Sequence, residues 1–169
     1  MPNRWVKLFE DFSNQQTLTV YHNSPSKIDE FTSRPIWASL ELDESLAFYD
    51  NSMETIGESY LYEIVVKGNF EWDIDTTLEE NGIDSYEYLA DITSNPSEEE
   101  LLSYPGTKLF IDKGFDGIIH SDYYQWDPSQ DTDVILIFNP IKSFVSVKLM
   151  KNAQSLVNKY KKDNNIDNI

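Results

Sequence analysis

The chain has 169 residues, and its 30 acidic and 13 basic side chains give a formal net charge of −17. Because a protein with this much negative charge repels phosphate backbones and anionic lipid, we expect no direct binding to nucleic acid and no docking on a membrane. The length suits a single domain over residues 1–169, and 40% hydrophobic and 14% aromatic residues provide enough apolar material for a packed core.

Several predicted elements follow from hydrophobic periodicity and turn residues. In chain order we first expect strands at 17–22 and 35–40, and a helix from an Asp43 cap through Tyr49 with Leu46, Ala47 and Tyr49 facing the core. A strand at 60–67 and helices at 83–92 and 97–103 follow. The last elements are a glycine-bracketed turn and apolar strand within 113–120, strands at 133–139 and 141–150, and a lysine-rich amphipathic helix at 151–162. Ser97-Glu98-Glu99-Glu100 is a capping box. Strands and helices do not alternate regularly, which favours the α+β class.

Cysteine is absent, which excludes disulfides, thiolate zinc sites and a cysteine nucleophile. Residues 1–10 contain Arg4 and Lys7 but no apolar run, so we predict neither a signal peptide nor a membrane span there. We therefore expect an intracellular, cytoplasmic protein.

Charge is distributed unevenly along the chain. Residues 142–169 hold six lysines and two aspartates, whereas the remaining 141 residues hold seven basic and 28 acidic side chains, a formal charge of −21. One interpretation is a solvated surface that ends in a lysine-rich helix. The other is an acidic body that steers a basic partner toward it, with nucleic-acid mimicry as the extreme case.

The residues available for catalysis are few. The sequence has two histidines and contains no HExxH, Walker, GxGxxG or GxSxG motif. One loop is acidic and contains Asp122, Asp127, Asp131 and Asp133. Their spacing does not match the calcium-binding loop of an EF-hand, so we interpret it as a solvated loop and expect no metal. His22 ends a predicted strand, where it either forms a structural hydrogen bond or lines a cleft.

Five segments occur in a recognisable order. They are Tyr21-His22-Asn23-Ser24, Ile36-Trp37-Ala38-Ser39, Ser45-Leu46-Ala47-Phe48-Tyr49, Gly114-Phe115-Asp116-Gly117-Ile118-Ile119, and the apolar run from Asp131 to Lys142 that contains Phe138-Asn139-Pro140. In order and spacing they resemble the ADP-ribosyltransferase superfamily, particularly its small bacterial and phage members, over about residues 18–145.

This resemblance implies a split β-sheet core with flanking helices and NAD as substrate. It places His22 on the adenosine ribose, Trp37 on the nicotinamide ring and Asp133 in the catalytic position, with Asp131 next to it. The rest of the implied cofactor site comprises Asn23, Ser24, Arg34, Ser39 and Tyr49. The pyrophosphate would be held either by backbone amides near Asn23 and Ser24 or by the Arg34 side chain.

The sequence departs from the family pattern at three positions. Asn23 stands where the family has glycine, Trp37 replaces a tyrosine or a Ser-Thr-Ser triplet, and the third motif has aspartate where most active members have glutamate. Without the resemblance, Trp37 would be interpreted as a core aromatic and Asp133 as an exposed residue at the start of a strand.

The expected function is transfer of ADP-ribose from NAD to a macromolecular acceptor, a protein side chain, with release of nicotinamide and no metal. The target would be a basic or nucleic-acid-binding protein. Two alternatives remain open: a NAD glycohydrolase on the same fold, and a non-enzymatic acidic protein that inhibits a partner by occupying its basic site.

Overall fold

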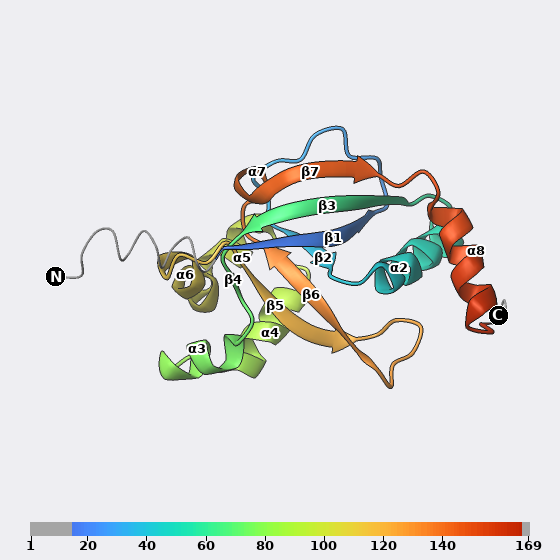
Figure 1. The fold of residues 1–169 in the computed structure, drawn as a ribbon. Helices are drawn as coiled ribbons and strands as arrows, with labels where there is room; N and C mark the ends of the chain where they lie inside the picture. Colours follow the sequence, from blue (N-terminus) through green and yellow to red (C-terminus); the bar gives the residue numbers. More distant parts are fainter. Residues whose placement is uncertain (1–14, 167–169) are drawn as a thin grey trace.

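The computed structural model describes residues 15–166 and has an α+β fold (Figure 1). Its strands are β1 (Gln16–Ser24), β2 (Ile36–Ser39), β3 (Tyr60–Gly68), β4 (Phe70–Glu71), β5 (Gly117–Tyr123), β6 (Asp131–Ile137) and β7 (Phe144–Leu149). Its helices are α2 (Leu42–Thr55), α3 (Ile74–Glu80), α4 (Ser85–Thr93), α5 (Glu98–Ser103), α6 (Pro105–Asp112), α7 (Pro140–Ser143) and α8 (Ala153–Asp163). The prediction about residues 1–10 falls outside the described residues.

All the described strands form one seven-stranded sheet in the order β4-β5-β6-β2-β1-β3-β7. The pair β4 and β5 is parallel, and the other neighbours are antiparallel. Pairing is extensive between β1 and β3, which are in register from Gln16↔Gly68 to Ser24↔Tyr60. In contrast, β1 and β2 are joined at the single pair Tyr21↔Ser39. The sheet is therefore continuous but weakly connected at its centre.

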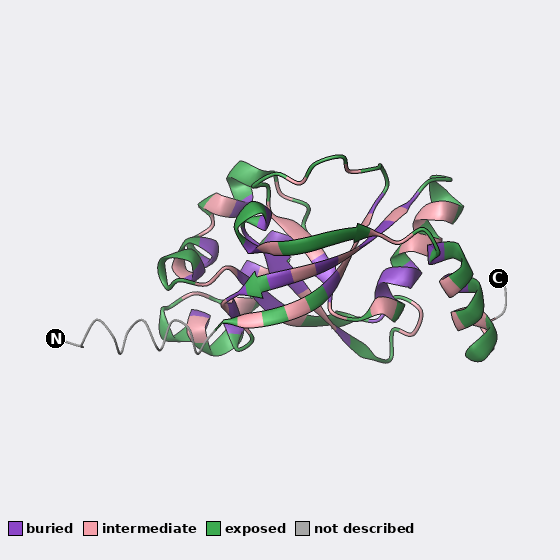
Figure 2. Ribbon diagram, turned by 45° about the horizontal axis from the view of Figure 1, so that its top comes forward, coloured by how far each residue is buried: buried purple, intermediate pink, exposed green. Residues whose placement is uncertain are grey.

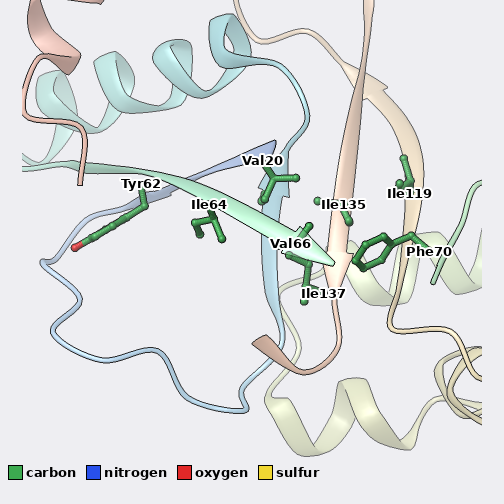
Figure 3. Packing of buried hydrophobic residues seen from close by; sticks show 9 residues of the cluster. Val20, Tyr62, Ile64, Val66, Phe70, Ile119, Ile135 and Ile137 are labelled. Carbon is green, nitrogen blue, oxygen red and sulfur yellow. The ribbon is translucent and has the colours of Figure 1, made fainter. Parts of the chain in front are cut away.

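One face of the sheet, called the first face here, carries a hydrophobic cluster (Figure 3). Because side chains alternate along a strand, every second residue of the central strands contributes to it. Its buried members are Val20, Ala38, Tyr62, Ile64, Val66, Phe70, Ile119, Ile135 and Ile137. Ile28 and Phe31, from the connection between β1 and β2, pack against this cluster, so that connection covers part of the first face.

The opposite face, called the second face, is covered by two separate groups of helices (Figure 1). Helices α3 to α6 pack over β5 and β6 through a cluster that includes Phe110, Ile118 and Leu136. Helices α2 and α8 pack over β1 and β3 through a cluster that includes Leu61 and Val157. Figure 2 shows buried positions, in purple, in the central strands and on the inner faces of helices, whereas edge strand β7 is largely exposed.

Most of the predicted elements are confirmed, with shifted limits. The helix predicted from Asp43 is longer, because Glu41 is its N-cap residue and Asp43 lies in its first turn. Residues 141–150 do not form one strand: α7 precedes β7, and Pro140 lies at the start of α7, where a missing N–H has no cost. Ser97 does cap α5, since its Oγ accepts a hydrogen bond from the Glu100 N–H at 3.2 Å.

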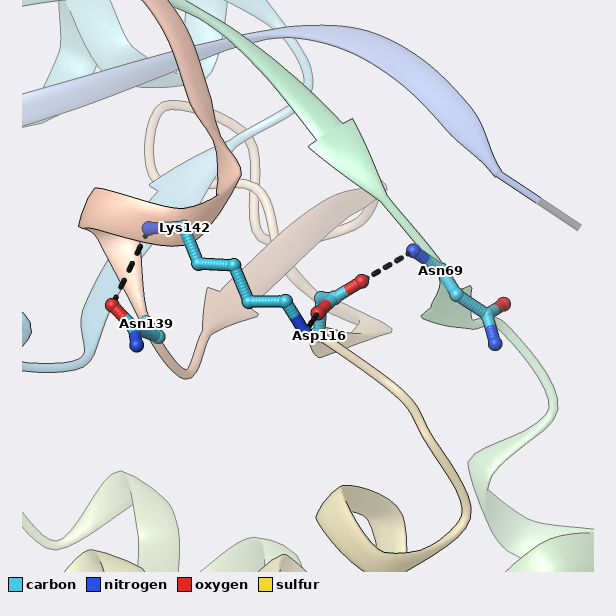
Figure 4. A network of polar contacts seen from close by, with 4 residues as sticks. All are labelled: Asn69, Asp116, Asn139 and Lys142. Atoms are coloured by element: carbon cyan, nitrogen blue, oxygen red, sulfur yellow. Dashed lines mark hydrogen bonds and ion pairs between the residues drawn. The ribbon is translucent and has the colours of Figure 1, made fainter. Parts of the chain in front are cut away.

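A polar network holds the start of β5 in place (Figure 4). Asp116 accepts a hydrogen bond from the Asn69 N–H at 2.8 Å and forms a 2.8 Å ion pair with Lys142. Asn139 in turn caps α7 by accepting from the Lys142 N–H at 3.4 Å. These contacts fix the turn before β5 to β4 and α7. Between residues 15 and 166, no helix is both long and apolar enough to cross a membrane.

Candidate functional site

A cavity of about 430 Å³ lies on the second face, where α2 and α4 both reach it. Its lining residues are Tyr21, His22, Asn23, Trp37, Ala38, Ser39, Ser45, Phe48, Thr93, His120, Asp122 and Val134. Ser45 and Phe48 come from α2 and Thr93 from the end of α4. The cavity therefore lies between the two groups of helices and above the centre of the sheet.

The floor of the cavity is set by strand register. His120 pairs with Val134, Val134 with Ser39, and Ser39 with Tyr21, so the four residues form one row across β5, β6, β2 and β1. Residues in register have side chains on the same face of a sheet. Trp37 lies two residues before Ser39 and so shares this face. Its indole meets the His120 imidazole edge to face, with ring centroids 5.4 Å apart.

His22 follows Tyr21 and pairs with Tyr62, so its ring lies toward the first face, where it meets the Phe31 ring edge to face with centroids 6.2 Å apart. It also lines the cavity, next to the single Tyr21↔Ser39 pair that joins β1 to β2. Its Nδ1 lies 2.6 Å from the Trp37 carbonyl oxygen, so a side chain replaces the backbone pairing that is missing there. A carbonyl oxygen only accepts, so Nδ1 must carry a proton. Burial lowers the pKa of His22, although the hydrogen bond to Trp37 opposes that shift. The neutral ring then leaves Nε2 as an acceptor.

Two polar residues of the wall also hold the fold together. Asn23 donates from Nδ2 to Ser52 Oγ at 3.2 Å and accepts at Oδ1 from Ser59 Oγ at 2.6 Å. Ser39 Oγ accepts from the Glu41 N–H at 3.1 Å, at the start of α2. These bonds tie the cavity wall to α2 and fix its shape.

The structure brings four of the predicted cofactor residues to this cavity: His22, Asn23, Trp37 and Ser39. Ser24 is buried at the end of β1, where its Oγ donates to the Ser26 carbonyl at 2.7 Å. Tyr49 instead packs in the cluster between α2 and α8. Neither Ser24 nor Tyr49 lines the cavity.

The two predicted catalytic aspartates do not lie in this cavity. Asp133 is directly opposite Ser121 and accepts a hydrogen bond from its Oγ at 3.2 Å. Because Val134 faces the cavity, strand alternation directs Asp133 to the other face. Asp131 is exposed at the start of β6, opposite Tyr123.

The carboxylate that does line the cavity is Asp122, near the end of β5. It lies on the same face of the strand as His120, two residues earlier. Neither residue was predicted as part of the site. Alternation within 117–123 places the two residues together, but only the pairing of β5 with β6 shows that they face Val134 and Ser39.

A second cavity of about 200 Å³ adjoins the first, since Trp37 and Thr93 line both. Arg34 lines this second cavity together with Asn95 and Glu98. The guanidinium predicted to meet the pyrophosphate is therefore next to the main cavity rather than in it. Within residues 15–166, no group of three or more histidine or acidic side chains has an arrangement suited to a metal ion.

Comparisons with protein-family models, with curated proteins and with solved structures gave no significant match to this chain.

Proposed function

We propose that the protein binds NAD in the main cavity and transfers its ADP-ribose to a protein side chain, releasing nicotinamide. The observation that carries this proposal is the meeting of His22 with Trp37 and Ser39, from two separate sequence motifs, in one cavity. The cavity measures about 430 Å³. Ligand pockets typically measure about 300–1,000 Å³. Strands β1 and β2 are joined by a single residue pair, which also suits the split sheet that the resemblance implies.

The charges around the two cavities favour one orientation of the ligand. NAD has a cationic nicotinamide ring and an anionic diphosphate, and opposite charges attract more strongly in a partly desolvated site. Asp122 lines the main cavity, whereas Arg34 lines the adjoining one. We therefore place the nicotinamide against Trp37 near Asp122, and the diphosphate toward Arg34, whose planar guanidinium suits phosphate oxygens.

The reaction needs stabilisation of positive charge on the ribose. Breaking the bond between the anomeric carbon and the nicotinamide nitrogen gives that carbon oxocarbenium character, as in glycoside hydrolysis. A fixed carboxylate beside it lowers the barrier. Asp122 takes this role in the proposal in place of Asp133, because it is the carboxylate that lines the cavity. His22 Nε2 accepts a hydrogen bond from a ribose hydroxyl.

The test compares two aspartates that lie on opposite faces of neighbouring strands. Asp122→Asn and Asp133→Asn make the same chemical change, and only the first alters the cavity. With labelled NAD and a mixture of candidate acceptor proteins, Asp122→Asn should lower transfer by about 10²–10³-fold, whereas Asp133→Asn should leave it unchanged.

Two results would overturn the proposal at different levels. If the wild-type protein neither binds NAD in calorimetry nor releases nicotinamide, the function is wrong. If it turns NAD over and Asp122→Asn is fully active, the site is wrong. Release of free ADP-ribose with no label on protein would identify a NAD glycohydrolase instead.

A second candidate function, a non-enzymatic acidic binding protein, is favoured by one local feature. Residues 71–100, which include α3 and α4, contain eleven acidic and no basic side chains. An exposed surface of this kind attracts basic proteins with on-rates that fall as salt rises. Partner association that is insensitive to salt and to lysine substitutions in this segment would exclude this role.

A further inference from the structure

The second histidine of the cavity has a defined proton position. His120 Nδ1 lies 3.0 Å from the backbone carbonyl oxygen of Ser121. Because that oxygen can only accept, Nδ1 is the donor, and a neutral imidazole then carries its lone pair on Nε2. His120 is thus arranged as an acceptor at the cavity wall, in the row that Val134 and Ser39 continue.

The His120 Nε2 atom is buried and has no hydrogen-bond partner within residues 15–166. Buried polar atoms are almost always paired, so an unpaired one requires a functional or structural explanation. Here the imidazole itself lines the cavity, beside the Trp37 ring. The χ2 torsion of histidine is broad and roughly two-fold, so the ring can rotate about it when a molecule binds.

We propose that His120 is the general base that removes the proton from the acceptor, and that the acceptor is a hydroxyl group. This inference rests on the proposed function. The acceptor oxygen forms a bond to the anomeric carbon as the bond to the nicotinamide nitrogen breaks. The electrons of that bond neutralise the pyridinium, so nicotinamide leaves uncharged. The hydroxyl proton passes to His120 Nε2 and then to solvent.

The position of Asp122 supports this division of roles. His120 and Asp122 are alternate residues on one face of β5, and both line the cavity. One strand therefore presents the base for the acceptor and the carboxylate for the ribose to the same side of a ligand. A hydroxyl acceptor must lose its proton to a base, whereas a carboxylate acceptor is already deprotonated at neutral pH.

The other titratable groups of this region must be considered in any pH profile. His22, Tyr21 and Asp122 line the same cavity, and Glu44 of α2 interacts with Asp122. His22 has its Nδ1 proton engaged by Trp37, so it serves binding in this proposal. Its glutamine variant is therefore the matched comparison for that of His120.

The first experiment needs no substrate. The chain has only two histidines, so ¹⁵N imidazole spectra contain two rings, and His22→Gln and His120→Gln assign them. We expect the neutral His120 ring to carry its proton on Nδ1, and its Nε2 resonance to shift when an unreactive NAD analogue and a serine peptide are added together. A proton on Nε2 in the free protein would overturn the assignment of His120 as a base.

The second experiment measures transfer to peptides that offer serine, threonine or tyrosine, against peptides that offer aspartate or glutamate. His120→Gln should lower kcat by about 10²–10⁴-fold with little change in the KM for NAD, and should remove the fall in rate at acidic pH. His22→Gln should mainly raise the KM for NAD.

The outcomes separate the two proposals. If wild type releases nicotinamide and His120→Gln keeps its rate and pH profile, only the role of His120 is refuted. Label found only on carboxylate side chains would refute the hydroxyl acceptor. Free ADP-ribose as the sole product, lost in His120→Gln, would support the base and identify water as the hydroxyl source. Absence of NAD turnover in wild type would refute the function and this inference with it.

Discussion

Gly117, at the start of β5, is the position where the smallest substitution should have the largest structural effect. A Cβ added there would lie 2.3 Å from the Leu136 backbone oxygen and 3.1 Å from the Phe70 ring. Carbon and oxygen normally approach to about 3.3–3.6 Å, so the two strands would have to separate by about 1 Å. Leu136 is in a central strand that pairs on both sides, with Ile118 and Trp37, and cannot move alone.

The expected magnitude follows from this rigidity. Inserting a methyl group into a packed core costs about 1–3 kcal/mol, and we expect Gly117→Ala at the upper end because the obstacle is backbone. For a chain of this size each kcal/mol lowers Tm by about 2–4 °C, so the loss should be about 6–12 °C. Urea unfolding followed by circular dichroism should give a lower midpoint with an unchanged slope.

Gly82→Ala is the control for this substitution. Gly82 has a φ of +72° and no atom within 4 Å of an added Cβ, so it carries the backbone strain of a left-handed residue without a clash. That strain alone costs about 1–2 kcal/mol. A loss of stability in Gly117→Ala that is no greater than in Gly82→Ala would refute the close packing of β5 against β6.

Two further predictions concern polar groups at helix starts. Burial, with repulsion from Asp122 and Glu41, raises the pKa of Glu44 against the opposing hydrogen bond from the Gln125 N–H. The contribution of Glu44 to the free energy of unfolding is therefore fully present below its unfolded pKa of 4.5 and is lost as pH rises through the raised folded pKa. In urea unfolding, Glu44→Gln should be more stable than wild type at pH 7 and equal to it near pH 4. A stability difference that does not depend on pH would contradict this. Ser97→Ala removes the α5 cap and should cost about 1 kcal/mol in the same assay, whereas Ser97→Thr should retain most of the stability.

The fold was predictable where one pattern dominated a segment. The apolar run at 133–139 indicated a strand covered on both faces, and Ile135, Leu136 and Ile137 are indeed fully buried. Helix α6 was not predicted, because it contains Gly106, a poor helix former. The structure explains the exception: a Cβ at Gly106 would lie 2.6 Å from the Tyr88 ring, so tertiary packing requires glycine there.

The candidate site was predictable only in part, for a reason of geometry. Motif order led to His22 and Trp37, which lie beside the single pair that joins β1 to β2. The choice of acid depended on which face of β6 each residue occupies, and a shift of one residue reverses that face. Pairing of β5 with β6 places Val134, not Asp133, at the cavity, and it is this long-range register that sequence patterns do not contain.

The same distinction applies to charge. A formal charge of −17 argues against a polyphosphate ligand, but binding depends on the few groups near the ligand, because exposed charges farther away than about 8–10 Å are screened by physiological salt. Among the residues that line the two cavities, Arg34 is the one basic side chain apart from the histidines. It shares its cavity with Glu98, and Asp122 lies in the cavity that Arg34 does not line. A dinucleotide with a cationic ring and an anionic diphosphate matches that separation, whereas an all-anionic ligand such as a nucleotide triphosphate would meet Asp122 unfavourably. The proposed orientation of NAD therefore rests on the positions of Asp122 and Arg34 and not on the net charge of the chain.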